Sequence, residues 1–294
     1  MHYVVSKIFC EKNPIVARII ISREWEGEIE HAKALLNTIM HKWPSGTRVW
    51  FIITSGGFIE APWPSDISSK DVPDARNPRP YIVKRLMNIA ENYVIRYLLT
   101  DSQIGLLKQI ARYITLGVDM HMDINNLRKS HVELVGVFDL TLEKFVLWTG
   151  KSYPKSNQPG LTCITDINSH FYAFEGIGET LILGCHDLKV FDPYHYNNPR
   201  RSEWRKEIIA KFHNIAKQRK PILVLQHPHT TVKVRTWQNA WKYLVKLVPS
   251  VRYYASAWRY YDPRVHPSKY NTLLDVLKAT KSRETHTIDF VVDQ

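Results

Sequence analysis

The sequence predicts an α/β fold, an α-β-β-α sandwich in which two mixed sheets pack together and helices cover their outer faces. Three observations predict it: the chain opens with a strand–helix–strand pattern, carries two hairpins in its middle, and closes with alternating strands and helices. Its 294 residues can bury a substantial core. Because nothing in the composition marks a boundary, we expect one domain over residues 1–294.

The first strand–helix–strand unit lies before residue 55. Val16–Ile21 is an apolar, β-branched run, and a helical stripe through Leu35 and Ile39 follows it. A Pro-Ser-Gly break then leads into a strand that begins near Thr47. Residues 59–80 are rich in proline and are predicted to form a long functional loop or lid.

The later elements are predicted by their apolar spacing, which has the helical period in some segments and an extended pattern in others. In chain order we expect helices over 81–97 and 104–111, a strand over 112–120, hairpins over 131–150 and 171–184, a helix over 204–215, a strand over 220–226, a helix over 237–248, and strands over 250–258 and 286–292. Hairpins between such units indicate mixed sheets.

Composition limits the class of protein. No apolar run approaches the roughly 18 residues that a membrane span needs. Three cysteines without a CxxC pair argue against a disulfide framework and for a reducing compartment, so we expect a cytoplasmic protein. The net charge of +12 permits a polyanionic partner such as nucleic acid, but no nucleic-acid-binding motif signals one.

A thiol, an imidazole and a carboxylate follow one predicted strand without a break. The apolar run ends at Gly184, and Cys185, His186 and Asp187 come next. A thiol at a strand end becomes nucleophilic where a nearby cation or base favours its thiolate. We therefore predict that Cys185 is a nucleophile and that His186 and Asp187 bind substrate. The alternative is a cysteine that is only a small buried hydrophobic residue.

Two histidines follow the strand over 220–226 in a similar way. His227 and His229 lie two residues apart, so an extended chain points them to the same side. Such a pair suits a metal ion or an anion. Ligands bind at the carboxyl ends of strands in open α/β sheets. We therefore expect Cys185, His186 and the His227–His229 segment to share one pocket, with both histidines binding substrate.

The order of these elements resembles that of the nitrilase, or carbon–nitrogen hydrolase, superfamily. The stretch "FYAFEGIGETLILGCHDLKVFDP" is similar to that family's hairpin, glycine, apolar strand and Cys-x-Asp-Leu segment. The stretch "VELVGVFDLTLEKFVLWTGKSYP" is similar to the strand pair that delivers its catalytic lysine. The resemblance extends over residues 19–258 and implies the α-β-β-α fold and hydrolysis of a C–N bond in an amide or nitrile.

The same resemblance implies roles for residues. Cys185 would be the nucleophile and Lys151 would stabilise the oxyanion, with Lys155 in reserve. A glutamate accepts the thiol proton in that family, directly after the second strand, where this chain has "IITSGGF". Glu60, six residues after Thr54, can take that role only if the Gly-Gly turn brings it back. No cofactor and no metal ion are implied.

Two other functions stay open. "GCHD" and "HPHTT" are similar to weakened motifs of calcineurin-like metallophosphoesterases, in which Asp119, His121 and Asp139 would supply further metal ligands, although cysteine stands where that family has asparagine. A binding protein that keeps the sandwich without the chemistry is the third alternative. For the hydrolase we expect a small-molecule substrate, a homo-oligomer and no membrane partner.

Overall fold

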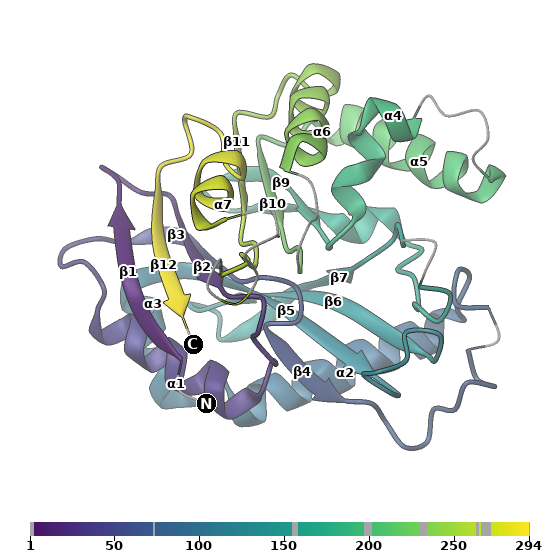
Figure 1. Ribbon diagram of the computed structural model, residues 1–294, viewed down its shortest axis with the longest axis horizontal. Helices are drawn as coiled ribbons and strands as arrows, with labels where there is room; N and C mark the ends of the chain where they lie inside the picture. The colour runs from purple at the N-terminus through teal and green to yellow at the C-terminus, as the bar shows by residue number, and fades with distance from the viewer. Residues whose placement is uncertain are drawn as a thin grey trace.

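The computed structural model describes residues 3–72, 74–154, 158–196, 202–229, 234–262, 265 and 272–293. Two mixed β-sheets pack against each other in it, and helices lie on both outer sides (Figure 1). The predicted α-β-β-α sandwich of mixed sheets is therefore confirmed. Within the described part of the chain, no helix combines the length and the apolar surface needed to cross a membrane.

The larger sheet has the strand order β1-β12-β2-β3-β5-β6-β7, and β4 also pairs with β5. Its strands are β1 (Val4–Cys10), β2 (Val16–Ile21), β3 (Val49–Ile53), β4 (Ile59–Pro62), β5 (Ala111–His121), β6 (His131–Asp139), β7 (Lys144–Gly150) and β12 (Thr287–Asp293). Strands β12, β2, β3 and β5 run parallel, whereas β1, β6 and β7 pair in the antiparallel sense. The central strands are covered on both faces, which explains their continuous apolar sequences.

The smaller sheet has the order β11-β10-β9-β8. Its strands are β8 (Phe171–Phe174), β9 (Gly178–Leu183), β10 (Leu223–Gln226) and β11 (Tyr253–Ser256). Strands β9, β10 and β11 are parallel, so their carboxyl ends lie at the same edge of the sheet. Strands β8 and β9 form a hairpin in which Gly176 in the turn and Gly178 at the start of β9 have positive φ, a backbone conformation that favours glycine.

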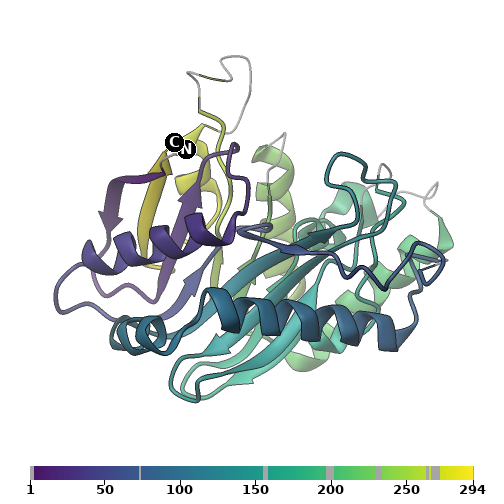
Figure 2. The same cartoon turned by 90° about the horizontal axis from the view of Figure 1, so that it is seen from below.

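Three layers of apolar side chains hold the sandwich together. Between the sheets, Phe51 and Tyr113 of the larger sheet pack in one cluster with Ile182 and Leu225 of the smaller sheet. The helices cover the outer faces: α1 (Ile29–His41), α2 (Pro80–Tyr97) and α3 (Asp101–Ile110) lie on the larger sheet, and α5 (Glu203–Arg219), α6 (Val234–Leu247) and α7 (Leu273–Ala279) lie on the smaller sheet. Figure 2 shows the first three helices across the outer face of the larger sheet. A four-residue helix, α4 (Pro193–Tyr196), precedes α5.

The sequence did not predict β1, β4, α4 and α7, nor the two short 3-10 helices at Ile167–His170 and Asp187–Phe191. Strand β4 lies inside the segment that was expected to be a loop throughout, and it pairs in parallel with the end of β5. A four-residue strand that contains Pro62 gives little local signal, because proline cannot donate to a β ladder. The helices and both hairpins predicted for residues 81–248 are present.

Candidate active site

A cavity of about 380 Å³ lies at the carboxyl ends of the parallel strands. Residues that follow β2, β3, β9, β10 and β11 line it together with side chains carried on β4, β5 and β6, in agreement with the usual place of ligand sites in α/β sheets. Its lining comprises Arg23, Trp25, Glu26, Gly57, Glu60, Asp119, His121, Ile124, Leu127, Glu133, Lys151, Gln158, Cys185, His186, His229 and Arg259.

Cys185 is held at the end of β9 by the carboxylate of Asp187. Asp187 Oδ2 accepts from the Gly184 backbone N–H at 3.0 Å, and Oδ1 accepts from Ser152 N at 2.9 Å and Tyr153 N at 2.7 Å. A Cβ on Gly184 would lie 2.9 Å from the backbone of Lys151, so the two segments approach too closely for a larger residue. Asp187 thereby joins the segment of the thiol to the segment of Lys151.

Lys151 and Glu133 form a buried ion pair beside Cys185. Lys151 Nζ donates to both carboxylate oxygens of Glu133, at 2.7 and 2.9 Å, and to Gln158 Oε1 at 2.7 Å. Burial alone would raise the pKa of Glu133, but the charges of Lys151 and His229 outweigh it and lower the pKa to about 2. Burial would likewise lower the pKa of Lys151, and Glu133 raises it instead. Both groups are therefore charged at neutral pH.

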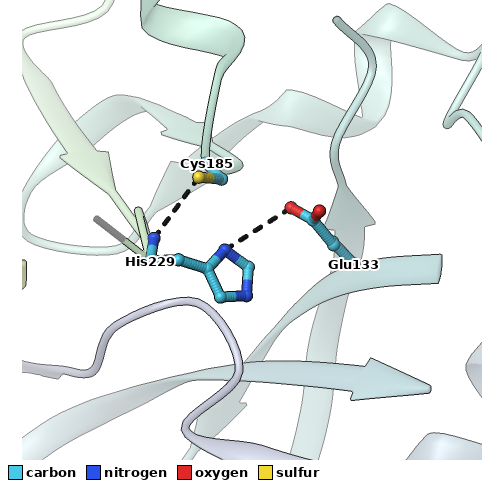
Figure 3. A group of neighbouring side chains, drawn as sticks. All are labelled: Glu133, Cys185 and His229. Carbon is cyan, nitrogen blue, oxygen red and sulfur yellow. Dashed lines mark hydrogen bonds and ion pairs between the residues drawn. The ribbon is translucent and has the colours of Figure 1, made fainter. Parts of the chain in front are cut away.

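His229 contacts the thiol of Cys185 and the carboxylates of Asp119 and Glu133. Figure 3 shows it with Cys185 and Glu133. Its backbone N–H donates to Cys185 Sγ at 3.3 Å, while ring Nε2 donates to Asp119 Oδ2 at 2.5 Å and ring Nδ1 lies 3.6 Å from Glu133 Oε2. Burial opposes a charge on the ring, but Asp119 and Glu133 raise the pKa of His229 to about 10. A ring nitrogen of His229, an oxygen of Glu133 and Cys185 Sγ lie within 4.8 Å of one another.

A second group of side chains lies on the larger sheet. Glu60 on β4 is directly opposite Asp119 on β5, and Glu60 Oε1 lies 2.9 Å from His121 Nδ1. Burial and the nearby Asp119 raise the pKa of Glu60, whereas the hydrogen bond from His121 acts against this rise. Burial alone would lower the pKa of His121. The surrounding carboxylates outweigh burial, so the pKa of His121 is raised. The predicted catalytic residue Glu60 thus lines the cavity, bonded to His121.

Arg259 fixes the Gly-Gly turn at the end of β3. Its guanidinium donates to the carbonyl oxygens of Trp25 at 2.8 Å, Gly56 at 2.9 Å and Gly57 at 2.6 Å. Burial lowers the pKa of Arg259 to about 10, which leaves it positively charged at neutral pH. Gly57 has φ +58°, and a Cβ there would lie 2.7 Å from the guanidinium and 2.9 Å from an Asp119 oxygen. The turn therefore requires glycine at this position.

Of the other predicted site residues, some line the cavity and others are buried away from it. His186 lines the cavity, and its ring lies 6.0 Å from that of Trp237. His227 and Asp187 are buried and are absent from the cavity lining, which corrects the expectation that the whole His227–His229 segment faces one pocket. His227 Nδ1 lies 2.7 Å from the Thr54 carbonyl oxygen, and burial lowers its pKa to about 4. Lys155 lies outside the described residues.

Four charged residues of the cavity were missed from the sequence, namely Arg23, Glu26, Glu133 and Arg259, and the last two make the buried contacts described above. Glu133 is the second residue after the start of β6, where it faces the cavity from a strand whose other residues are mostly apolar. An ionisable side chain inside such a strand was the available signal, because an unpaired buried charge is costly. Arg259 follows β11 as His229 follows β10, so a search of all strand ends would have found it.

Comparison with known proteins gives structural relatives only. No family model and no curated protein matches the sequence. Among solved structures, an amidase from Nesterenkonia sp. is similar over 85% of this chain and 78% of its own, with 12% identity and a TM-score of 0.45. A variant of a Nesterenkonia AN1 amidase, described as belonging to the nitrilase superfamily, is similar over 85% and 79% with 12% identity and a TM-score of 0.44.

A further structure of that amidase carries acrylamide added to its active-site cysteine. It covers 83% of this chain and 79% of its own, with 13% identity and a TM-score of 0.43.

Proposed function

We propose that this chain is a nitrilase-like hydrolase, formed by residues 1–294 as one domain, that cleaves the C–N bond of a small amide or nitrile through Cys185. One observation carries the proposal. Cys185 Sγ lies at a strand end within 4.8 Å of both a His229 ring nitrogen and the Glu133 carboxylate, and Glu133 is bonded to Lys151. A nucleophile, a proton carrier and an oxyanion donor therefore face one cavity.

Two cations lie beside the Cys185 sulfur, the imidazolium of His229 and the ammonium of Lys151. Such neighbours are typical of nucleophilic cysteines. Asp119 orients the imidazolium through a 2.5 Å bond to Nε2, and a ring nitrogen lies within 4.8 Å of Cys185 Sγ. A closer approach of the ring to the thiol would complete the nucleophile–base–orienter arrangement of cysteine and serine hydrolases. Glu133 lies between the cations and keeps both in place.

The first half of the reaction would transfer the acyl group to sulfur. The thiolate attacks the amide carbon to form a C–S bond, and the carbonyl π electrons move onto oxygen. Lys151 redirects one of its three N–H donors to that oxyanion. When the oxyanion collapses, the C–N bond breaks and the His229 imidazolium supplies the proton with which the nitrogen leaves as an amine or ammonia. A thioester and a neutral imidazole remain.

The second half would use the same groups in reverse. The neutral imidazole takes a proton from water as the water oxygen attacks the thioester carbon, and Lys151 again binds the oxyanion. The C–S bond then breaks, which releases the carboxylic acid and restores the thiolate and the imidazolium. The sum is one amide and one water converted to one acid and one amine. A nitrile would form a thioimidate at the same carbon.

Glu133 is a second candidate for the role that the resemblance implied for Glu60, namely acceptance of the thiol proton. Glu133, rather than Glu60, shares the cluster with Cys185, and Glu60 shares a cluster with Asp119 and His121. We infer that Glu60 acts on the substrate or on a ligand bound beside it.

The cavity volume of about 380 Å³ suits a small molecule. A cytoplasmic location, a homo-oligomer and a polyanionic partner remain predictions.

Alkylation provides the test. Cys10 is exposed and would react as well, so the experiment uses a Cys10→Ser background. Cys163 is buried, which raises its pKa to about 12 and keeps its thiol unreactive. We expect iodoacetamide to modify Cys185 rapidly near neutral pH, located by peptide mass spectrometry. The same background should release ammonia from acetamide, propionamide or their nitriles, and Cys185→Ala should abolish that release.

Two outcomes would support the alternatives instead. If Cys185 resists alkylation and no amide or nitrile is hydrolysed, the chain is a binding protein. If Cys185→Ser keeps its activity, while 4-nitrophenyl phosphate is hydrolysed and a chelator stops that hydrolysis, the phosphoesterase alternative holds.

A further inference from the structure

We propose that Glu60, Asp119 and His121 form a binding site for a divalent cation, of the type of Zn²⁺ or Mn²⁺, in the same cavity as Cys185. The proposal does not depend on hydrolysis by Cys185. It departs from the expectation that the site uses no metal ion, and it rests on strand register, ligand spacing and an unpaired carboxylate oxygen.

The three side chains lie on two paired strands. Asp119 and His121 are two residues apart on β5, so they point to the same face of the strand. Strand β4 runs parallel to β5 with Glu60 opposite Asp119 and Pro62 opposite His121. Because the ladder fixes this register, the three side chains need no loop movement to come together. Sites built on strands are held more accurately than sites built on loops.

The spacing of the ligand atoms suits one ion. A carboxylate oxygen of Glu60, one of Asp119 and a ring nitrogen of His121 lie within 4.8 Å of one another. Ligands at about 2.0–2.2 Å from a shared zinc ion are about 3–4 Å from each other, so small side-chain rotations are enough. Stacking of the His121 ring on His131, with centroids 5.3 Å apart and planes at 10°, restrains the imidazole.

Asp119 supplies an independent observation. Its Oδ2 accepts from His229, but within the described ranges no group donates to its Oδ1, and the residue is only 4% exposed. The guanidinium of Arg259, which lies beside Gly57 as Asp119 does, donates to three carbonyl oxygens. A buried carboxylate oxygen without a partner costs free energy, and a cation is the partner that removes this cost.

The donor set decides the class of ion. Imidazole nitrogen suits zinc, whereas carboxylate oxygens suit manganese or magnesium, so one imidazole with two carboxylates favours Zn²⁺ or Mn²⁺. The ion would replace the proton that Glu60 Oε1 and His121 Nδ1 share across 2.9 Å, and its binding would release protons. Three protein ligands leave coordination positions open toward the cavity for water or a substrate atom.

Calorimetric titration of the chelator-treated, full-length Cys10→Ser protein with ZnCl₂ and with MnCl₂ tests the proposal. We expect one site per chain for at least one of the two ions, and a melting temperature that rises with the concentration of that ion. His121→Gln and Glu60→Gln should each weaken binding by at least about 10- to 100-fold, the loss that even outer-shell partners cause. The exposed His41 provides the matched control, because His41→Gln should bind like the parent.

A second cluster of potential metal ligands, Glu133 with Cys185 and His229, lies in the same cavity, so variants of both clusters show which one holds the ion. Cys185→Ala should bind the ion with unchanged affinity. An ion that is lost in Cys185→Ala but kept in His121→Gln would occupy the other cluster and overturn the proposal, as would a parent protein that binds neither ion. Failure of the hydrolase proposal would leave all these results unaffected, because none of them measures turnover.

Discussion

The two sheets build opposite walls of the cavity in different ways. The wall from the smaller sheet, here called the cysteine wall, consists of Cys185, His186 and His229. The wall from the larger sheet, here called the acid wall, consists of Glu60, Asp119, His121 and Glu133. Residues of the cysteine wall follow strands, whereas those of the acid wall lie within strands. The cysteine wall therefore depends on loop contacts, and the acid wall on the register of β4, β5 and β6.

The reactive thiol therefore lies on one wall of the cavity, and the charges that control its reactivity lie on the other. The thiol of Cys185 is presented by a turn that the Asp187 carboxylate holds. The charges that govern it come from the opposite wall, because Glu133 and Asp119 keep His229 protonated. Changes in the acid wall should therefore alter both the stability of the protein and the chemistry at Cys185.

The largest effect is expected at the buried ion pair of the acid wall. Glu133→Gln leaves the Lys151 ammonium buried without its counter-charge, which should lower the free energy of unfolding by about 3–5 kcal/mol. Urea denaturation measures this. Glu143 in the exposed pair with Lys108 is the matched control, and Glu143→Gln should cost no more than about 1 kcal/mol. Equal losses in the free energy of unfolding for Glu133→Gln and Glu143→Gln would show that the buried pair stabilises the fold no more than the exposed pair does.

Loss of the Lys151 charge should reduce turnover more than substrate affinity. Lys151→Met removes the proposed oxyanion donor, and one such donor contributes about 100- to 1000-fold to kcat. Ammonia release at a temperature where circular dichroism shows a folded protein gives kcat and KM. Lys144→Met, at the exposed start of β7, should leave both unchanged. A rise in KM with kcat preserved would assign Lys151 to substrate binding instead.

His227 and His229, which follow β10, should make the stability of the protein depend on pH in opposite directions. His229 has a pKa raised from 6.5 to about 10, so its contribution is complete below pH 6.5 and is lost as the pH rises toward 10. His227 has a pKa lowered to about 4, so stability falls as the pH drops from 6.5 toward 4 and the unfolded chain takes up a proton first.

Denaturation curves between pH 4 and 10 measure both limbs. His229→Gln should flatten the alkaline limb and leave the acid limb, whereas His227→Gln should do the reverse. Unchanged slopes in either variant would show that other groups control that limb.

The smallest effect is expected for Glu60. In metal-free protein, Glu60→Gln should lower ammonia release by less than about tenfold, because in our proposal His229 carries the proton. A general base contributes about 100- to 10,000-fold. A loss of that size in metal-free Glu60→Gln would restore to Glu60 the catalytic role that the resemblance implied, and it would show that the acid wall supplies the base.

The layered fold and the cysteine wall could be predicted from local patterns in the sequence. Its apolar periodicity located five helices, α1, α2, α3, α5 and α6, and both hairpins. The abrupt ends of β9 and β10 identified Cys185 and His229. Such features are visible because a polar residue directly after an apolar run is a local pattern. Lys151 entered through the resemblance, and it lines the cavity beside them. Whether one domain covers the whole chain stays a prediction.

The carboxylate charges that surround the thiol could not be predicted from local patterns, because they come from the opposite sheet. Glu133 and Cys185 are 52 positions apart in the numbering, and they meet because β6 of one sheet faces the end of β9 of the other. The tertiary structure also separated His229, which reaches the cavity, from His227, which bonds to Thr54. Local patterns show where a polar side chain interrupts an apolar run. Its partner and charge state depend on sheet packing, because burial and neighbouring charges across the fold set both.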